Sequence, residues 1–412
     1  MNNRKNALLG ELVDNHDNRR VPLSSAQRAT LEKLYPYYGA QSVIDYVDNY
    51  IFDGEFILVA EDGENLKSQK QKVCQVVTGK FWVNNHAHII SASGKNNTRY
   101  LAYLLNLIDF KPYITGSAQP KLTKENLSLI KLTIHEPDAQ IKIAAVLSSL
   151  DAKIALNHRI NGELEGLAKL LYDYWFVQYD FPLSAAQAAA LGKPKLAGQP
   201  YRTSGGKMLF NPTLKREIPG GWEVDNILAI ADLGGGATPS KKSTEFWKGT
   251  IPFFTPTDAR NEPFCLDTED HITQEGLSNS STRLYDEGTL FITARGSVGK
   301  AMIISKEMAM NQSCYALIPR EGVGCAFLYF HTLSLMGFLH AKSSGSVFKS
   351  IVTNDIKFTP AIVPKSEILK EFSTFTEPLF DQILNNQRQN QELTALRDWL
   401  LPMLMNGQVR VV

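Results

Sequence analysis

Residues 154–164, I-A-L-N-H-R-I-N-G-E-L, return later in the chain as residues 383–393, I-L-N-N-Q-R-Q-N-Q-E-L. Six of the eleven positions are identical at an offset of 229 residues (154 to 383). With the same offset, Gly116-Ser117 falls on Gly345-Ser346. Self-similarity at a fixed offset is the signature of an internal repeat. The sequence therefore predicts two copies of one unit, each a globular part followed by a long helix.

The two repeated stretches lie in long segments with helical period. One follows Pro137 and runs to about Gln178, and the other follows Pro364 and runs to about Asn406. Alternating steps of four and three residues define an apolar stripe, which is typical of a coiled-coil seam. At about 1.5 Å per residue, a helix of about 40 residues is about 60 Å long. The seam positions are Ile143, Leu147, Leu150, Ile154, Asn157, Asn161, Leu164, Ala168, Leu171 and Trp175, and the same set shifted by 229.

Two asparagines interrupt each stripe at equivalent places, Asn157 and Asn161 in the first helix and Asn386 and Asn390 in the second. A buried seam asparagine costs stability but fixes the register of the helices. We expect an antiparallel helix pair in which Asn157 faces Asn390 and Asn161 faces Asn386. The alternative is that each asparagine lies at the edge of the seam and is solvated.

Short β-branched and aromatic runs between turn residues precede each helix, for example E-F-I-L-V-A at 55–60 and T-L-F-I-T-A at 289–294. Residues 183–219 are rich in Ala, Pro, Gly and Lys, which favours a basic, exposed connector. The predicted boundaries are a first globular domain at 1–136, a central helix at 137–182, the connector at 183–219, a second globular domain at 220–363 and a C-terminal helix at 364–412.

Composition excludes several classes of protein. The formal net charge is +1, so binding of nucleic acid by bulk positive charge is not expected. A selective reader with a few well-placed cations stays open. No apolar run approaches the roughly 18–20 residues that span a bilayer, and the first residues lack the apolar core of a signal peptide. We expect a cytoplasmic protein without a membrane partner.

Catalytic and metal-binding motifs are missing. The run A-R-G-S-V-G-K at 294–300 lacks phosphate-loop spacing, and L-G-G-G-A-T-P at 233–239 reads as a turn. Asn211-Pro212 is not followed by the aromatic of an amino-methyltransferase motif. His86 and His88 have no third ligand nearby, and the four cysteines show no paired spacing. The sequence predicts no catalytic residue and no metal site.

Several stretches together resemble the specificity subunit of type I restriction–modification systems, over nearly the whole chain. They are Y-P-Y-Y-G-A (35–40), D-Y-V-D-N-Y-I-F-D-G-E-F-I-L-V-A-E-D-G (45–63), F-W-V-N-N-H-A-H-I-I (81–90), G-S-A-Q-P-K-L (116–122), L-L-Y-D-Y-W-F-V-Q-Y-D-F (170–181), E-I-P-G-G-W (217–222), G-G-G-A-T-P-S (234–240) and R-D-W-L-L-P-M-L-M-N-G-Q-V (397–409).

The resemblance implies an α+β fold: two β-rich target-recognition domains related by a pseudo-twofold repeat, joined and spaced by two long antiparallel coiled-coil-like helices. It implies that each domain reads one half of a split double-stranded DNA target, in DNA methylation and defence against foreign DNA. The implied partners are two methyltransferase subunits and restriction/translocase subunits. S-adenosylmethionine, ATP and Mg are then expected on the partners only, and no cofactor on this chain.

Cations and amides in polar, loop-like stretches are the candidates for DNA contacts, because Arg and Lys bind guanine or phosphate and Asn binds adenine. The repeated Gly-Ser turns are candidates for contact with phosphates. For any single residue, a solvated surface charge is the alternative. The candidates are Arg19, Arg20, Lys67, Lys70, Lys95, Asn97, Arg99 and Ser117 in the first domain, and Lys241, Lys242, Arg260, Arg283, Arg295 and Ser346 in the second.

The run at 170–181 is the densest in aromatic residues. Leu171 and Trp175 lie on the seam. Tyr172, Tyr174 and Phe176 point around the helix, where we expect that one packed partner cannot cover them all. These four residues are candidates for docking of a methyltransferase subunit, with plain structural packing as the alternative.

Three other functions stay open at this point. They are a subunit of a methylation-only system, an enzyme such as a methyltransferase or restriction–modification fusion, and a coiled-coil adaptor that binds no DNA.

Overall fold

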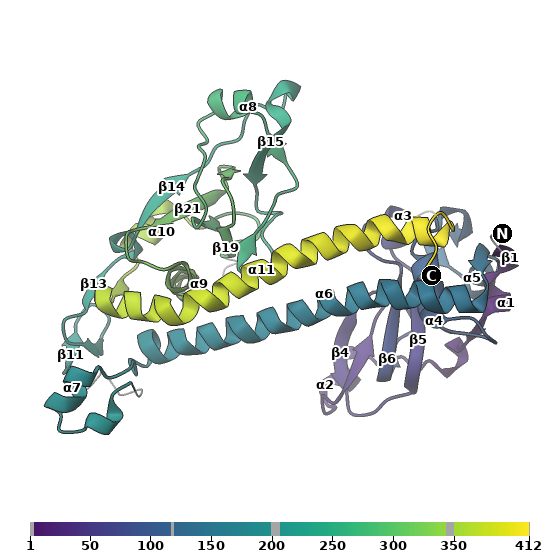
Figure 1. The fold of residues 1–412 in the computed structure, drawn as a ribbon, viewed down its shortest axis with the longest axis horizontal. Helices are drawn as coiled ribbons and strands as arrows, with labels where there is room; N and C mark the ends of the chain where they lie inside the picture. Colours follow the sequence, from purple (N-terminus) through teal and green to yellow (C-terminus); the bar gives the residue numbers. More distant parts are fainter. Residues whose placement is uncertain (1–3, 117–118, 199–206, 343–349, 412) are drawn as a thin grey trace. The chain divides into compact units, whose positions relative to one another are not determined.

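The computed structural model describes residues 4–116, 119–198, 207–342 and 350–411. Contacts divide the chain into two units. Unit 1 holds Met1–Ala155 and Gln391–Val412, and unit 2 holds Leu156–Asn390. The two long helices, α6 (Pro137–Tyr172) and α11 (Ser366–Met405), each contribute one segment to either unit, so a unit is a β-rich body plus a piece of each helix (Figure 1).

The body of unit 1 contains a six-stranded sheet in the order β2-β7-β5-β6-β3-β4. Neighbouring strands are antiparallel except β3 and β6. The central strand carries the predicted run at 55–60, and its last five residues are buried. The strands are β2 (Val13–Asn15), β3 (Tyr35–Tyr38), β4 (Val43–Val47), β5 (Phe52–Ala60), β6 (Cys74–Val83) and β7 (Ala87–Ala92).

Short helices and two small strand pairs complete unit 1. Asn97 and Thr123 begin α4 and α5, since each side-chain oxygen accepts a hydrogen bond from the backbone N–H three residues later. The elements are β1 (Arg4–Leu8) paired with β10 (Lys131–His135), β8 (Ile114–Thr115) paired with β9 (Lys121–Leu122), and α1 (Leu9–Leu12), α2 (Ser25–Ala29), α3 (Asn65–Ser68), α4 (Thr98–Leu105) and α5 (Lys124–Ser128).

Unit 2 contains a five-stranded sheet in the order β14-β21-β18-β19-β16 and a three-stranded sheet in the order β17-β15-β20. The apolar helix α9 (Cys325–Lys342) packs on β18 and β19. The strands are β14 (Ala231–Gly235), β15 (Trp247–Phe254), β16 (Phe264–Cys265), β17 (His271–Ile272), β18 (Leu290–Thr293), β19 (Ala301–Ile304), β20 (Ala309–Met310) and β21 (Cys314–Pro319), with α8 (Gln274–Ser278) and α10 (Thr353–Phe358) beside them.

The repeat is visible in the order of elements. In unit 2, β13 (Glu223–Asp225) pairs with β22 (Ala361–Val363), as β1 pairs with β10 in unit 1. In both units a short helix, then the last strand, then a long helix follow one another at the offset of 229 residues: α5, β10 and α6 in one, α10, β22 and α11 in the other. The predicted twofold repeat of a β-rich body and a long helix is confirmed.

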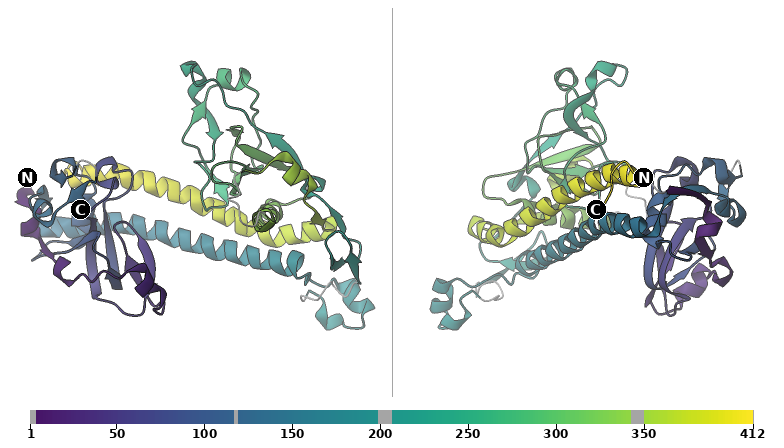
Figure 2. Two further views of the ribbon diagram at one scale, coloured as in Figure 1. Left: turned by 180° about the vertical axis from the view of Figure 1, so that it is seen from behind. Right: turned by 45° about the vertical axis from the view of Figure 1, so that its right-hand side comes forward.

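The long helices begin close to the predicted residues. Pro137 is the first residue of α6, where its missing N–H costs nothing, and Asp138 follows in the first turn. A π-helical turn, Asp173–Val177, extends α6 almost to the predicted end. Within unit 2, α6 and α11 lie side by side in all views (Figure 2).

Two local expectations need correction, and one helix was not predicted. The segment 183–219 is not a plain exposed connector: its described part forms α7 (Ala185–Ala190) and a hairpin of β11 (Met208–Asn211) and β12 (Arg216–Pro219), and it buries Leu183, Ala188 and Ile218. The glycine run at 233–239 is no turn at its start, because Gly234 and Gly235 belong to β14. A Cβ on Gly234 would lie 2.4 Å from the Tyr285 hydroxyl, so the glycine permits close packing. The sequence analysis also missed α9, a largely apolar helix without a periodic face.

Candidate nucleic-acid interface and helix seam

Four of the candidate residues in unit 1 have structural partners. Arg20 donates to Glu61 at 2.6 Å and to the Ala87 carbonyl at 2.9 Å. Asn97 caps α4, and Arg99 pairs with Glu55 at 2.7 Å. Arg19 lies over the Phe52 ring, 4.6 Å from its centre, and donates to the Ile51 carbonyl.

The lysines are placed differently. Lys70 and Lys95 are exposed, and Lys67 is half-buried in α3. Arg20 and Asn97 are thus engaged inside the body, whereas Arg19 and Arg99 make contacts at its surface and stay exposed, as do Lys70 and Lys95.

All five candidate cations of unit 2 are exposed: Lys241, Lys242, Arg260, Arg283 and Arg295. They lie in the loops that follow β14, β15 and β18 or precede β18. The Arg283 guanidinium stacks on the Tyr285 ring, 4.5 Å from its centre, which orients the charged group while the residue stays exposed. Solvent-exposed cations on loops of a rigid sheet are suited to contact phosphates or base edges.

The repeated Gly-Ser turns lie partly outside the described residues. Ser117 and Ser346 both fall there, as does Gly345. Gly116 is described, with a φ of +84°, and a Cβ on it would lie 2.3 Å from the Gln119 carbonyl oxygen. Glycine is therefore required at this turn in the first copy.

A buried ionic cluster stabilises the body of unit 1. His88, which is 1% exposed, has Nδ1 2.6 Å from the Asp17 carboxylate and Nε2 2.8 Å from the Leu122 carbonyl oxygen. Both partners are acceptors, so both ring nitrogens donate and the ring is positively charged. The predicted absence of a metal ligand role for His88 stays a prediction, but its two nitrogens are already occupied.

The pKa values in this cluster follow from its geometry. Burial disfavours the charged ring, but the hydrogen bonds to Asp17 and Leu122 and the charges of Asp17 and Glu61 outweigh it and raise the pKa of His88. Burial likewise opposes ionisation of Asp17, but hydrogen bonds from His88 and from the Ile89 N–H lower its pKa overall. Arg20 is the main partner that lowers the pKa of Glu61 against the effect of burial.

The seam asparagines are buried and face one another within unit 2. Asn157 Nδ2 donates to Asn390 Oδ1 at 2.9 Å, and Asn386 Nδ2 donates to Asn161 Oδ1 at 2.8 Å. These distances are what the antiparallel pairing requires. With exposures of 0 to 8%, the asparagines are not solvated at a seam edge, so that alternative is wrong.

The aromatic cluster is mostly core. Tyr172, Trp175 and Phe176 are 3 to 6% exposed, whereas Tyr174 is 40% exposed. As expected, no single packed helix covers these rings: α9 and α11 together cover three of the four, and Tyr174 stays exposed. Plain structural packing, the alternative to docking, therefore holds for Tyr172, Trp175 and Phe176. Phe176 contacts Phe327 of α9 at 4.6 Å and Phe372 of α11 at 5.0 Å between ring centres. Only Tyr174 remains available for docking.

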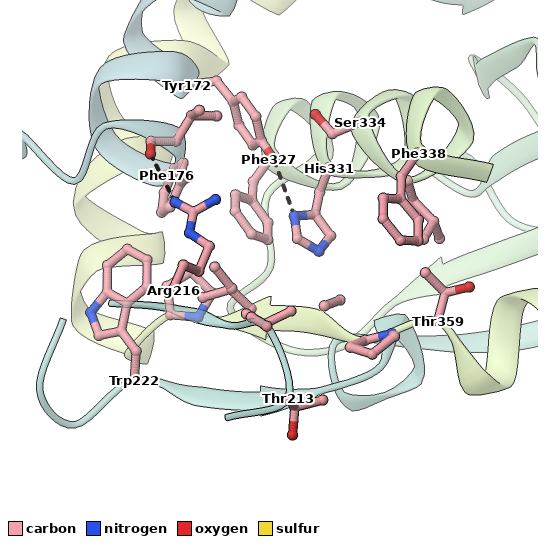
Figure 3. Close-up of a pocket in the computed structure, with 17 residues that line it drawn as sticks. Tyr172, Phe176, Thr213, Arg216, Trp222, Phe327, His331, Ser334, Phe338 and Thr359 are labelled. Atoms are coloured by element: carbon pink, nitrogen blue, oxygen red, sulfur yellow. Dashed lines mark hydrogen bonds between the residues drawn. The ribbon is translucent and has the colours of Figure 1, made fainter. Parts of the chain in front are cut away.

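A cavity of about 390 Å³ lies beside the cluster, within unit 2. Figure 3 shows Phe176, Trp222, Phe327 and Phe338 lining it, with the Tyr172 hydroxyl pointing to His331 Nδ1 at 3.1 Å. Burial lowers the pKa of His331 to about 4. Nδ1 of the neutral ring accepts a hydrogen bond from the Tyr172 hydroxyl, so the two residues form an uncharged pair in an apolar wall.

Comparison with known proteins places the chain in a family. A family model described as the type I restriction modification DNA specificity domain matches residues 3–166 and again residues 219–395. The chain belongs to the specificity subunits of type I restriction–modification systems.

Curated relatives agree with the family match. The specificity subunit is 28% identical to the type I restriction enzyme HindI specificity subunit of Haemophilus influenzae, over 70% of this chain and 71% of the relative. It is 26% identical to the MjaIX specificity subunit of Methanocaldococcus jannaschii, over 76% and 69%. A crystal structure of a type I restriction–modification S subunit from M. genitalium matches with a TM-score of 0.59 at 13% identity, over 98% of this chain and 96% of that one, which shows the shared fold.

Among the residues that the structure describes, this specificity subunit has no group of three or more His, Cys, Asp or Glu that could hold a metal ion. None of the described helices is both long and apolar enough to cross a bilayer. Cys74, Cys265 and Cys314 are buried free thiols whose pKa is raised by burial, and Cys325 is a half-buried one.

Proposed function

We propose that this specificity subunit reads a bipartite double-stranded DNA target, one half with each β-rich body, and catalyses no reaction itself. The observation that carries the proposal is the double match: one DNA specificity domain in each copy of the repeat, each reaching into the long helix of that copy. Members of the family supply DNA specificity, and two reading domains in one chain suit a target in two halves.

Helix length supports a fixed gap between the half-sites. Helix α6 has 36 residues and α11 has 40, so at about 1.5 Å per residue each is about 54 to 60 Å long. Half-sites one turn of DNA apart are separated by about 34 Å. Helices of this length can hold reading domains at that order of spacing.

Exposed cations of unit 2 are the proposed contacts in that body, and Lys70 and Lys95 in unit 1. Arg20 and Asn97 are engaged within the protein, so we propose for them a role in shaping the body. The cofactor expectation stays a proposal: S-adenosylmethionine, ATP and Mg belong to the partner subunits.

Duplicated apolar side chains support two copies of one partner. Leu167 and Leu170 on α6 are 46% and 50% exposed. Their equivalents at the offset of 229, Leu396 and Trp399 on α11, are 44% and 56% exposed. Exposed large apolar residues repeated at equivalent sites are suited to protein contacts. We propose that each pair binds one methyltransferase subunit, and that restriction subunits join through the assembled complex in the cytoplasm.

Selection from a random DNA library tests the function. The chain, assembled with its methyltransferase subunits, is bound to the library at two salt concentrations, and the retained fragments are sequenced. We expect a consensus with two short conserved blocks and an unread gap of fixed length. Retention without any consensus would contradict sequence reading. One continuous block would contradict the bipartite target.

Partner binding is tested separately. Changing Leu396 and Trp399 to Ser is expected to remove one of the two methyltransferase subunits, read as complex mass by native mass spectrometry. Leu129→Ser, which changes an exposed leucine away from both helices, is the control and should leave the mass unchanged. A mass that stays at two partners in the double variant would contradict this docking site. A chain that binds methyltransferase normally but lacks restriction subunits would favour a methylation-only system.

A further inference from the structure

The pseudo-twofold repeat gives every contact across the helix pair a counterpart. Because α6 and α11 pack antiparallel and repeat at an offset of 229, a contact in unit 1 corresponds to a contact in unit 2 made by the equivalent residues. The repeat relates the two central asparagine pairs to each other: Asn157 with Asn390 corresponds to Asn386 with Asn161. Both helices therefore carry asparagine at the same two central positions, and these positions do not distinguish α6 from α11.

The charges near the unit 1 end have no equivalent in unit 2. Arg397 donates to Asp151 at 2.8 Å, and the Tyr103 hydroxyl donates to the same carboxylate at 2.6 Å. The equivalent positions in unit 2 are Phe380 for Asp151 and Ala168 for Arg397, and both are buried in the apolar core. One pair of positions is thus ionic in one unit and apolar in the other.

Side-chain volume differs in the same way. Trp175 packs on Phe372 in unit 2, with ring centres 5.5 Å apart. Their equivalents in unit 1 are Leu404 and Ile143, both buried in its core. Large residues therefore pack with large at one end of the helix pair, and medium-sized aliphatic residues pack together at the other.

We propose that these positions make the helix of each half select the helix of the other half and disfavour pairing with a second copy of itself. If α6 paired with another α6, Asp151 would face Ala168 and Ile143 would face Trp175. If α11 paired with another α11, Arg397 would face Phe380, and Leu404 would face Phe372. Each like pairing loses the ion pair and mismatches volume, while the asparagines keep the register in every case.

The test uses the complete chain, cut once after purification. A protease site is placed at Gly192, in the exposed turn at 191–195, so that α6 and α11 lie on different pieces. After prolonged incubation, native mass spectrometry counts complexes of unlike pieces and of like pieces. We expect the cut wild-type chain to stay as the complex of unlike pieces. If like complexes form as often as random pairing of the two pieces would give, or if the pieces separate into monomers, the proposal is overturned.

Two variants isolate the ionic positions. The first combines Asp151→Phe with Arg397→Ala, which gives unit 1 the residues of unit 2 at these positions. In the wild type, turning two unlike complexes into two like complexes breaks two ion pairs, whereas the variant has no such pair to break. The ratio of like to unlike complexes should therefore be at least about tenfold higher in the variant than in the wild type. The second combines Asp151→Arg with Arg397→Asp. It keeps opposite charges across the pair and should behave as wild type.

The uncut variants are first compared with wild type by circular dichroism, which reports whether the helices form. An unchanged ratio in the first variant would overturn the proposal. A ratio in the charge-exchanged variant that rises as much as in the first would overturn it too, because the effect would then not depend on complementary charge. That second variant also decides the matter if the first one fails to fold.

Discussion

The bodies of units 1 and 2 end on the same order of elements and both bury aromatic rings, but the polar groups buried in them differ in chemistry. Unit 1 buries a charged cluster, in which His88 lies between Asp17 and the Leu122 carbonyl oxygen. Unit 2 buries rings: Phe176, Trp222 and Phe327 meet at the end of α6, beside the uncharged Tyr172–His331 pair. The repeat therefore constrains the edge strand, the short helix before it and the long helix, and leaves each interior free to change.

The largest expected effect is in the aromatic interior. Phe176→Ala should destabilise unit 2 by about 3–5 kcal/mol, because it leaves a cavity among three packed rings. Tyr174→Ala is the matched control, since Tyr174 is 40% exposed, and should cost far less. Hydrogen exchange measured by mass spectrometry locates the loss. Equal loss of protection in unit 1 would contradict the separation of the two interiors.

The ionic interior should respond to loss of its central ring. His88→Gln leaves the Asp17 carboxylate with a weaker partner and should cost about 2–4 kcal/mol in unit 1. The raised pKa of His88 means that its contribution is complete below about pH 6.5 and is lost as pH rises through the folded-state pKa. The difference between wild type and variant in urea unfolding should therefore shrink at alkaline pH. A difference that grows with pH would show that the ring is neutral.

His331 in unit 2 should show the opposite dependence of stability on pH. The pKa of His331 is lowered to about 4, so the unfolded chain takes up the proton more readily below pH 6.5. Its effect is to reduce stability by up to a few kcal/mol as pH falls from about 6.5 towards 4. His331→Phe should lose this dependence, measured as the unfolding midpoint of unit 2 against pH. A variant with the wild-type slope would assign the slope to another group.

The smallest expected effect concerns the helix that both units share. Gly162 is exposed within α6, and a Cβ on it would meet nothing within 4 Å. Gly162→Ala should therefore stabilise the protein by about 0.5–1 kcal/mol through helix propensity. Gly116→Ala is the contrasting control, because its Cβ would strike the Gln119 carbonyl, and it should destabilise. A destabilising Gly162→Ala would contradict the open space around this position of α6.

The features that repeat along the chain could be predicted from the sequence. The offset between Asn157 and Asn386 predicted both long helices and the amide pairs, because antiparallel packing of equal halves leaves one alignment of the four asparagines. The contacts that do not repeat could not be predicted from the sequence. Arg20 looked like a free cation, since Glu61 lies 41 positions away in sequence and only the folded sheet brings them together.

The element that buries the aromatic run was not predicted, for a similar reason. Tyr172 and Phe176 point off the seam, and the element that covers them, α9, has no amphipathic period to reveal it. The glycines at 234 and 236 look like turn residues, but they allow backbone and side chains to approach closely. Partners that are distant in sequence decide such positions.

Single-molecule sequencing of methylated DNA, from cells that express this chain with its methyltransferase, tests the central claim most directly. We expect adenine methylation at one bipartite motif, with two short specific blocks and a gap of constant length. Methylation confined to a continuous motif, or to no motif while the methyltransferase is active, would contradict the claim that two bodies of this specificity subunit each read half of one target.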